Sequence, residues 1–286
     1  IEAVRSAMAR GVSGARVLGI HIEGPYISIE QKGAHDERFI REPSDEEVEV
    51  LLKHIDVVKR VTAAPEVRGC LKLGKLLSSR GVLMSIGHSN AVMDEVLRAL
   101  DYGYSHVTHI YSATSMTRRI RAYRYPGVVE AAYLIDELTV EVIADGKHLP
   151  PTLVRLVLKN KGLDRVCIVT DAMRAAGLPP GRYRLGSIEA IVDEGVAWLP
   201  DRTAFAGSVA KMNTMIRFLV EDVGLSLQDA IKLATVNPAK IIGVDRYKGS
   251  LAPGKDADIV VMDRGFEVLM TMVEGRVVYK SKEWPH

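Results

Sequence analysis

Carboxylate and imidazole side chains recur where short apolar segments of this sequence end. Glu23 lies near the end of GIHIEGPY, and His88 and His109 follow apolar residues in SIGHSN and VTHIYS. A carboxylate and two histidines could bind a zinc-type ion and leave one position open for water, which is typical of catalytic rather than structural sites. Each residue alone has a simpler explanation, since a strand-end carboxylate is often solvated and a lone histidine is more often structural. A site requires a fold that brings the three together.

Two further residues could perform acid–base chemistry near such a site. Asp171 follows the apolar run in DRVCIVTDAM, and His148 lies just beyond another run in IADGKH. A positioned carboxylate can accept a proton and pass it to a leaving group, and an imidazole can polarise a carbonyl oxygen. Asp171 could instead cap the following turn, and His148 could merely hydrogen-bond its own loop. His21 shares a strand face with Glu23, which makes a site there more plausible.

The pattern of apolar residues predicts the elements that carry these side chains. Strands are predicted within residues 16–24, 58–66, 81–89, 105–112, 138–146 and 164–173, and helices within 1–11, 45–55, 67–81, 90–103 and 150–162. Alternating strands and helices predict an α/β fold with a parallel sheet, either doubly wound or a (β/α)8 TIM-type barrel. A barrel gathers the carboxyl ends of its strands around one axis. Candidate ligands at those ends favour the barrel, and its first two strands are expected to precede residue 1.

The C-terminal third has a different pattern. Short strands with turns are predicted near residues 182–205, helices from about 208 to 242, and Gly-separated strands in the tail. We therefore predict a barrel domain over residues 1–242 with a β insertion, followed by strands of a small β-sandwich over residues 243–286. A small β-layer needs partners for its apolar face, and we expect those partners upstream as well.

Composition excludes several classes of protein. The chain has 286 residues, 47% of them hydrophobic, and a net charge of +2, which does not predict binding to nucleic acid or to an acidic membrane. No apolar run approaches the about 18 residues of a membrane span. Cys70 and Cys167 form neither a zinc cluster nor a disulfide framework, so a reducing compartment, the cytoplasm, is predicted.

An ordered set of short segments resembles the N-acetylglucosamine-6-phosphate deacetylases of the amidohydrolase superfamily. The segments are HIEGPYIS, KGAH, APE, GHSNA, THIYSA, IADGKH, VTDAMRAAG, AGS and GSLAPGKDADIVV. Each is weak alone, but together they follow the family's order over essentially the whole chain.

The resemblance implies roles for individual residues. It implies that Glu23, His88 and His109 bind a divalent metal, zinc or iron, with a second ion left open, and that Asp171 is the catalytic acid–base. It also implies a set of substrate-binding residues: Ala34, His35, Ser112, Ala113, Arg124, His148, Phe205, Ala206 and Gly207. His148 would contact the acetamide, and Arg124 would bind phosphate, often across a homodimer interface.

The implied activity is deacetylation of a small amino sugar phosphate. Two departures from the family bear on phosphate binding: Ser112 stands where asparagine is usual, and the basic segment at residues 114–127 is longer. Two alternatives stay open, another amidohydrolase acting on a different N-acyl or cyclic amide, and a non-catalytic barrel that binds a sugar phosphate.

Overall fold

A six-stranded parallel sheet forms the centre of the molecule. The computed structural model describes residues 1–284. Along the sheet the strands are β1 (Ile20–Glu23), β2 (Val58–Ala63), β3 (Leu83–Ile86), β4 (Tyr104–Val107), β7 (Thr139–Ile143) and β8 (Val166–Val169). Their spatial order follows the chain order, which is the winding of a barrel, whereas the order reverses in a doubly wound sheet. The six predicted strands and the barrel-type fold are confirmed.

The sheet is strongly curled. The carboxylate of Glu23, at the end of β1, lies 2.9 Å from the ring of His109, which follows β4. Two strands separate β1 from β4, so a flat sheet would hold them roughly 14 Å apart. Curling of the sheet is what allows side chains from distant strands to meet at its carboxyl end.

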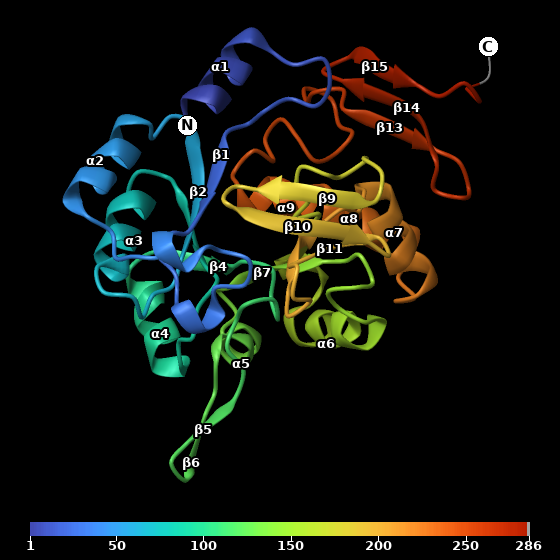
Figure 1. Cartoon of the computed structure of the whole chain (residues 1–286). Coiled ribbons are helices and arrows are strands. Elements are labelled where there is room, and N and C mark those ends of the chain that lie inside the picture. Colours follow the sequence, from blue (N-terminus) through green and yellow to red (C-terminus); the bar gives the residue numbers. More distant parts are fainter. Residues whose placement is uncertain (285–286) are drawn as a thin grey trace.

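Helices connect the parallel strands (Figure 1). They are α2 (Asp45–Lys53), α3 (Cys70–Ser78), α4 (Met93–Asp101), α5 (Val128–Leu134) and α6 (Pro151–Lys161), and the predicted opening helix is α1 (Glu2–Arg10). The Ser44 side chain accepts from the Glu47 amide, and the Glu47 side chain in turn accepts from the Ser44 amide, so a capping box starts α2. Among residues 1–284, no helix is both long and apolar enough to cross a bilayer.

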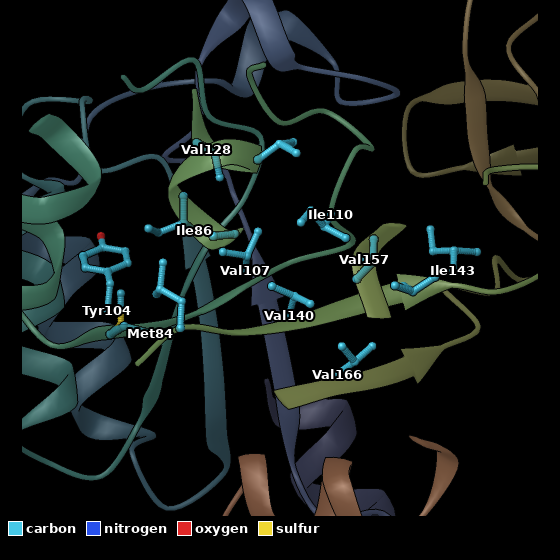
Figure 2. Packing of buried hydrophobic residues seen from close by; sticks show 14 of the residues in the cluster. Met84, Ile86, Tyr104, Val107, Ile110, Val128, Val140, Ile143, Val157 and Val166 are labelled. Atoms are coloured by element: carbon cyan, nitrogen blue, oxygen red, sulfur yellow. The ribbon is translucent and has the colours of Figure 1, made fainter. Parts of the chain in front are cut away.

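The main core packs between the sheet and these helices. Figure 2 shows Met84, Ile86, Val107 and Val140 of the central strands, all fully buried, packed with side chains from the covering helices. Close approach of α3 to the sheet requires a glycine, because a Cβ added at Gly74 would lie 2.4 Å from the ring of Tyr104 on β4. This buried apolar core fixes the position of the sheet whose carboxyl end carries the candidate ligands.

Two further sheets follow β8 along the chain. The first has the order β12-β11-β10-β9 and is antiparallel; its strands are β9 (Gly181–Leu185), β10 (Ile188–Asp193), β11 (Val196–Trp198) and β12 (Phe205–Ser208). Helices α7 (Met212–Glu221), α8 (Leu227–Ala234) and α9 (Val236–Ile241) lead to the antiparallel sheet β13 (Ile259–Met262), β14 (Val268–Val273) and β15 (Arg276–Lys280). These elements lie where the sequence predicted them. The division of the chain at residue 242 and the sandwich partners of the last sheet stay predictions.

One element was not expected from the sequence. Strands β5 (Arg118–Ile120) and β6 (Tyr123–Tyr125) form a hairpin that projects from the body of the molecule (Figure 1). Arg119 pairs with Arg124 in its register, and both are exposed. Three-residue strands rich in arginine show no alternation of apolar and polar residues, so periodicity alone could not have predicted them.

Candidate metal and substrate site

Three candidate ligands from three strands converge at the carboxyl end of the sheet. One carboxylate oxygen of Glu23, Oε1, lies 2.8 Å from Nε2 of His88 and 2.9 Å from Nε2 of His109. Both histidines are buried, and Glu23 is partly buried. The structure thus brings together the predicted set, and their ligand atoms lie within 4.8 Å of one another.

The outer nitrogen of each ring faces a main-chain carbonyl. Nδ1 of His88 lies 2.8 Å from the oxygen of Gln31, and Nδ1 of His109 lies 3.0 Å from the oxygen of Ser112. A carbonyl oxygen only accepts, so Nδ1 carries a hydrogen, and when the ring is neutral its Nε2 presents a lone pair toward Glu23. Three electron-pair donors then face one point, and a bound cation satisfies all of them. The donor set therefore fits a divalent metal of the zinc type.

Charge at this point supports the same conclusion. Burial opposes ionisation of Glu23, but hydrogen bonds with His109 and His88 outweigh it and hold the Glu23 pKa well below its usual range. Burial likewise disfavours the His109 imidazolium, yet its hydrogen bond to Glu23 raises the His109 pKa to about 9. Without a metal, a proton would take the place of the cation beside Glu23.

The candidate residues also share an uncommon backbone conformation. His88, His109 and Asp171 have φ angles of 48°, 26° and 46°, in the region that side chains other than glycine rarely adopt. Such conformations persist where the surrounding structure over-determines them, and they cluster at active sites. Gly87 allows one of these turns, because a Cβ there would lie 2.6 Å from Thr62 and 2.7 Å from Thr108.

Asp171 lies just beyond the end of β8 and lines the same cavity as the three ligands. Loss of hydration raises its pKa to about 6, with the positive charge of His109 opposing the rise and the Glu23 carboxylate adding to it. A carboxylate with this pKa can accept a proton near neutral pH and return it.

His148 lines the cavity from the loop after β7. Its Nδ1 lies 2.7 Å from Oδ2 of Asp145, and its ring contacts that of Phe205 in a tilted arrangement, with centroids 4.7 Å apart and an angle of 51° between the planes. Burial opposes ionisation of Asp145, but the hydrogen bond and charge of His148 lower the Asp145 pKa. The imidazole is therefore held from two sides in a fixed orientation.

The cavity has a volume of about 820 Å³ and includes nearly every residue predicted for the site. Its lining contains Glu23, Ala34, His35, His88, His109, Ser112, Ala113, His148, Asp171, Phe205, Ala206 and Gly207. His35 contacts His88 edge-on, with ring centroids 4.5 Å apart. Arg124 does not line the cavity of this chain, since it lies exposed on the projecting hairpin.

Sequence reasoning missed part of the cavity wall. The loop containing the 3-10 helix η2 (Glu37–Phe39) contributes Asp36, Phe39 and Ile40, and the turn between β9 and β10 contributes residues 185–188. The Ser187 hydroxyl donates to Asp36 at 2.6 Å and joins the two segments. The β insertion was predicted, but no local pattern indicated that it covers the site.

Comparisons with known proteins agree with this geometry. The model of the amidohydrolase family matches residues 2–278. The N-acetylglucosamine-6-phosphate deacetylase of Bacillus subtilis is 36% identical over 283 residues, 98% of this chain and 69% of that protein. The N-acetylgalactosamine-6-phosphate deacetylase of Escherichia coli O157:H7 is 34% identical over 281 residues, 97% of this chain and 72% of that protein.

Solved structures of deacetylases are similar to this chain over nearly its whole length. The crystal structure of N-acetylglucosamine-6-phosphate deacetylase from Pasteurella multocida has a TM-score of 0.89 at 33% identity, covering 96% of this chain and 70% of that one. A variant of the Mycobacterium smegmatis enzyme in complex with N-acetyl-D-glucosamine-6-phosphate has a TM-score of 0.87 at 34% identity, covering 96% and 71% of the two chains.

Proposed function

Because the chain belongs to the amidohydrolase family, we propose that it hydrolyses the N-acetyl group of N-acetylglucosamine 6-phosphate to glucosamine 6-phosphate and acetate. The observation that carries the proposal is the convergence of Glu23, His88 and His109 in one cavity with Asp171 and His148. The names of the relatives supply the substrate class.

Glu23, His88 and His109 would hold one divalent ion, zinc or iron. When bound, the ion supplies a Lewis acid that activates water at neutral pH and stabilises negative charge on the carbonyl oxygen. Asp171 takes the proton of the attacking water as the new carbon–oxygen bond forms. It then protonates the amide nitrogen as the carbon–nitrogen bond breaks, so the nitrogen leaves as an amine. His148 holds the carbonyl oxygen from the other side.

Assays on a panel of substrates test the proposal. Acetate and free amine would be measured with N-acetylglucosamine 6-phosphate, N-acetylgalactosamine 6-phosphate, unphosphorylated N-acetylglucosamine and an N-acetyl amino acid. We expect the first to have the highest kcat/KM. Preference for the galactosamine compound would favour the function named for the Escherichia coli relative. Turnover of the amino acid alone would favour another amidohydrolase, and no turnover by metal-loaded protein would favour a binding role.

The acid–base role of Asp171 predicts a pH dependence. Asp171 must be ionised to accept a proton, so kcat/KM should fall about tenfold per pH unit below the Asp171 pKa. That pKa is about 6 without metal, and a bound cation lowers it by favouring the carboxylate. The acid limb should therefore begin at or below pH 6. Metal content would be measured at each pH, and a flat profile down to pH 4 with metal retained would contradict the role.

We propose that the phosphate is bound by Arg124 of a second copy in a homodimer. The β5–β6 hairpin carries Arg119, Arg121 and Arg124 exposed and away from the cavity of its own chain. A guanidinium can bind phosphate through two parallel hydrogen bonds. We also propose a cytoplasmic location, in accord with the two buried free cysteines.

Arg124→Ala should raise KM for the phosphorylated substrate about tenfold or more and change kcat less. A hydrogen bond to a charged group contributes about 1.5–3 kcal/mol, and the phosphate is held equally in the ground and transition states. Steady-state kinetics with phosphorylated and unphosphorylated sugar would measure the effect. Arg119→Ala, which removes the same charge from the same hairpin, is the control. If both variants raise KM equally, the hairpin attracts the phosphate through its general positive charge, and Arg124 makes no specific contact with it.

A further inference from the structure

A second group of polar side chains is buried inside the curled sheet, and the proposed reaction does not use it. Arg60 of β2 donates from Nη1 and Nη2 to the two carboxylate oxygens of Glu141 on β7, at 2.5 and 2.9 Å. Its Nε donates to Ser85 at 2.9 Å, and Nη2 also donates to Thr108 at 2.6 Å. All four side chains are buried. Every nitrogen of the guanidinium thus has an acceptor, and the carboxylate is fixed in one orientation.

Glu141 also holds the turn that carries a candidate metal ligand. Its Oε1 accepts the main-chain N–H of His109 at 3.1 Å, and its main-chain oxygen accepts the N–H of Ile110 at 2.9 Å. Two successive amides of this turn therefore depend on one residue of the neighbouring strand. The same His109 backbone has a φ of 26°, a conformation that needs outside support.

The network continues to the other side of the site. Thr108 shares a hydrogen bond of 2.8 Å with Thr62, whose hydroxyl lies 2.7 Å from Nε2 of His21. His21 in turn lies 4.0 Å from Glu23. His21, expected from the sequence to share a face with Glu23, lies beside it on β1 and does not line the cavity. The buried hydrogen bonds thus run from the His109 turn to Thr62, and the exposed His21 lies between Thr62 and Glu23.

A purely structural role for the Arg60–Glu141 pair is the simpler explanation, but it does not account for the hydrogen bond to the His109 amide. A buried ion pair often adds little stability compared with apolar side chains of similar volume. Apolar side chains, however, offer no acceptor to the buried N–H of His109, and an unsatisfied buried amide is costly. The feature that only this pair supplies is therefore the acceptor at the metal-ligand turn.

We infer that Glu141 is a positioning residue for the metal site: its side-chain oxygen accepts the main-chain N–H of His109 and so holds the ring with Nε2 facing Glu23, while Arg60 balances the buried negative charge of Glu141. This inference rests on the proposed function, because it takes His109 as a metal ligand. Loss of a hydrogen-bonding partner behind a metal ligand typically weakens metal binding about 10–100-fold.

Two double variants separate positioning from packing. Arg60→Met with Glu141→Met removes both charges and the acceptor for the His109 amide. Arg60→Met with Glu141→Gln also removes both charges but keeps a carbonyl oxygen for that amide, and its NH₂ group can donate to His106 Nε2, which lies 3.3 Å from the replaced oxygen. The two proteins differ mainly in one acceptor. Their zinc dissociation constants would be measured by competition with a chelator. The geometry of the metal site would be compared by visible absorption spectroscopy of the cobalt-substituted proteins.

We expect the glutamine double variant to bind zinc within about threefold of wild type and the methionine double variant about 10–100-fold more weakly, with a changed cobalt spectrum. Equal affinities of both double variants and wild type would overturn the inference and leave a packing role. Wild-type protein that binds no zinc or cobalt would instead contradict the proposed function.

A single variant keeps the test valid if the methionine double variant does not fold. Glu141→Asp retains the charge that pairs with Arg60 but draws the carboxylate back by one methylene from the His109 amide. We expect zinc binding about tenfold weaker than in wild type. Unchanged zinc affinity in a folded Glu141→Asp protein would also overturn the inference.

Discussion

Alanine at His88 or at His109 should remove most of the bound divalent metal and nearly all deacetylation. Each ring would supply one of the three proposed protein ligands, and Glu23 would supply the third. A direct ligand matters more than the outer partners, whose loss costs about 10–100-fold in affinity. Elemental analysis of purified protein and steady-state kinetics would measure the two effects. We expect metal content well below one ion per chain in both variants.

His54→Ala is the matched control for this experiment. His54 caps the end of α2, contacts Arg5 of α1 and does not line the cavity. It should leave metal content and activity unchanged. Full metal occupancy in both the His88→Ala and the His109→Ala proteins would show that the ion is held elsewhere, and the ligand assignment would then be wrong.

Asp171→Asn should keep the fold and the metal while lowering kcat by more than about 10²-fold, because Asp171 acts as both base and acid in the proposed reaction. Asparagine has a similar shape but cannot accept the proton of water. Near-normal turnover by metal-loaded variant protein would assign the proton transfers to another group.

The same substitution should stabilise the metal-free protein at neutral pH. The Asp171 pKa of about 6 in the folded state exceeds its ordinary value of 3.8, so the unfolded chain loses its proton more readily. The stability contributed by this group is present below its unfolded pKa and is lost as the pH rises through about 6. The asparagine side chain cannot ionise, so the Tm of the variant should exceed that of wild type at pH 7 and approach it near pH 4.

Asp145→Asn is a control for which we expect the opposite change in stability at neutral pH. The Asp145 pKa is lowered in the folded state, as its hydrogen bond with His148 outweighs burial. Its contribution to stability is present above the unfolded pKa and is lost as the pH falls through the folded one. At pH 7 this variant should therefore unfold at a lower temperature than wild type. Thermal unfolding of the metal-free proteins at several pH values would show whether the two changes have opposite signs.

Much of the site could be predicted from the sequence because parallel strands share a direction. Apolar β-branched runs gave the strand positions, and each candidate ligand lies at or just past the end of such a run. Parallel strands end at the same edge of a sheet, so Glu23, His88, His109 and Asp171 had to lie at one edge once the sheet was predicted. Local periodicity is independent of long-range packing, so it indicates these positions without any knowledge of the tertiary structure.

Other features depend on which distant segments meet, and only the tertiary structure decided them. Arg60 and Glu141 are 81 residues apart and pair across two intervening strands, because the sheet curls; neither residue has a distinctive sequence context. The turn between β9 and β10 lines the cavity and is hydrogen-bonded to Asp36 on another part of its wall, and the β5–β6 hairpin carries Arg124 away from it. The sequence by itself determined which side chains lie at the carboxyl ends of the strands. Curvature and packing decided which of them meet, what supports them and what encloses them, since these depend on contacts between residues that no local pattern relates.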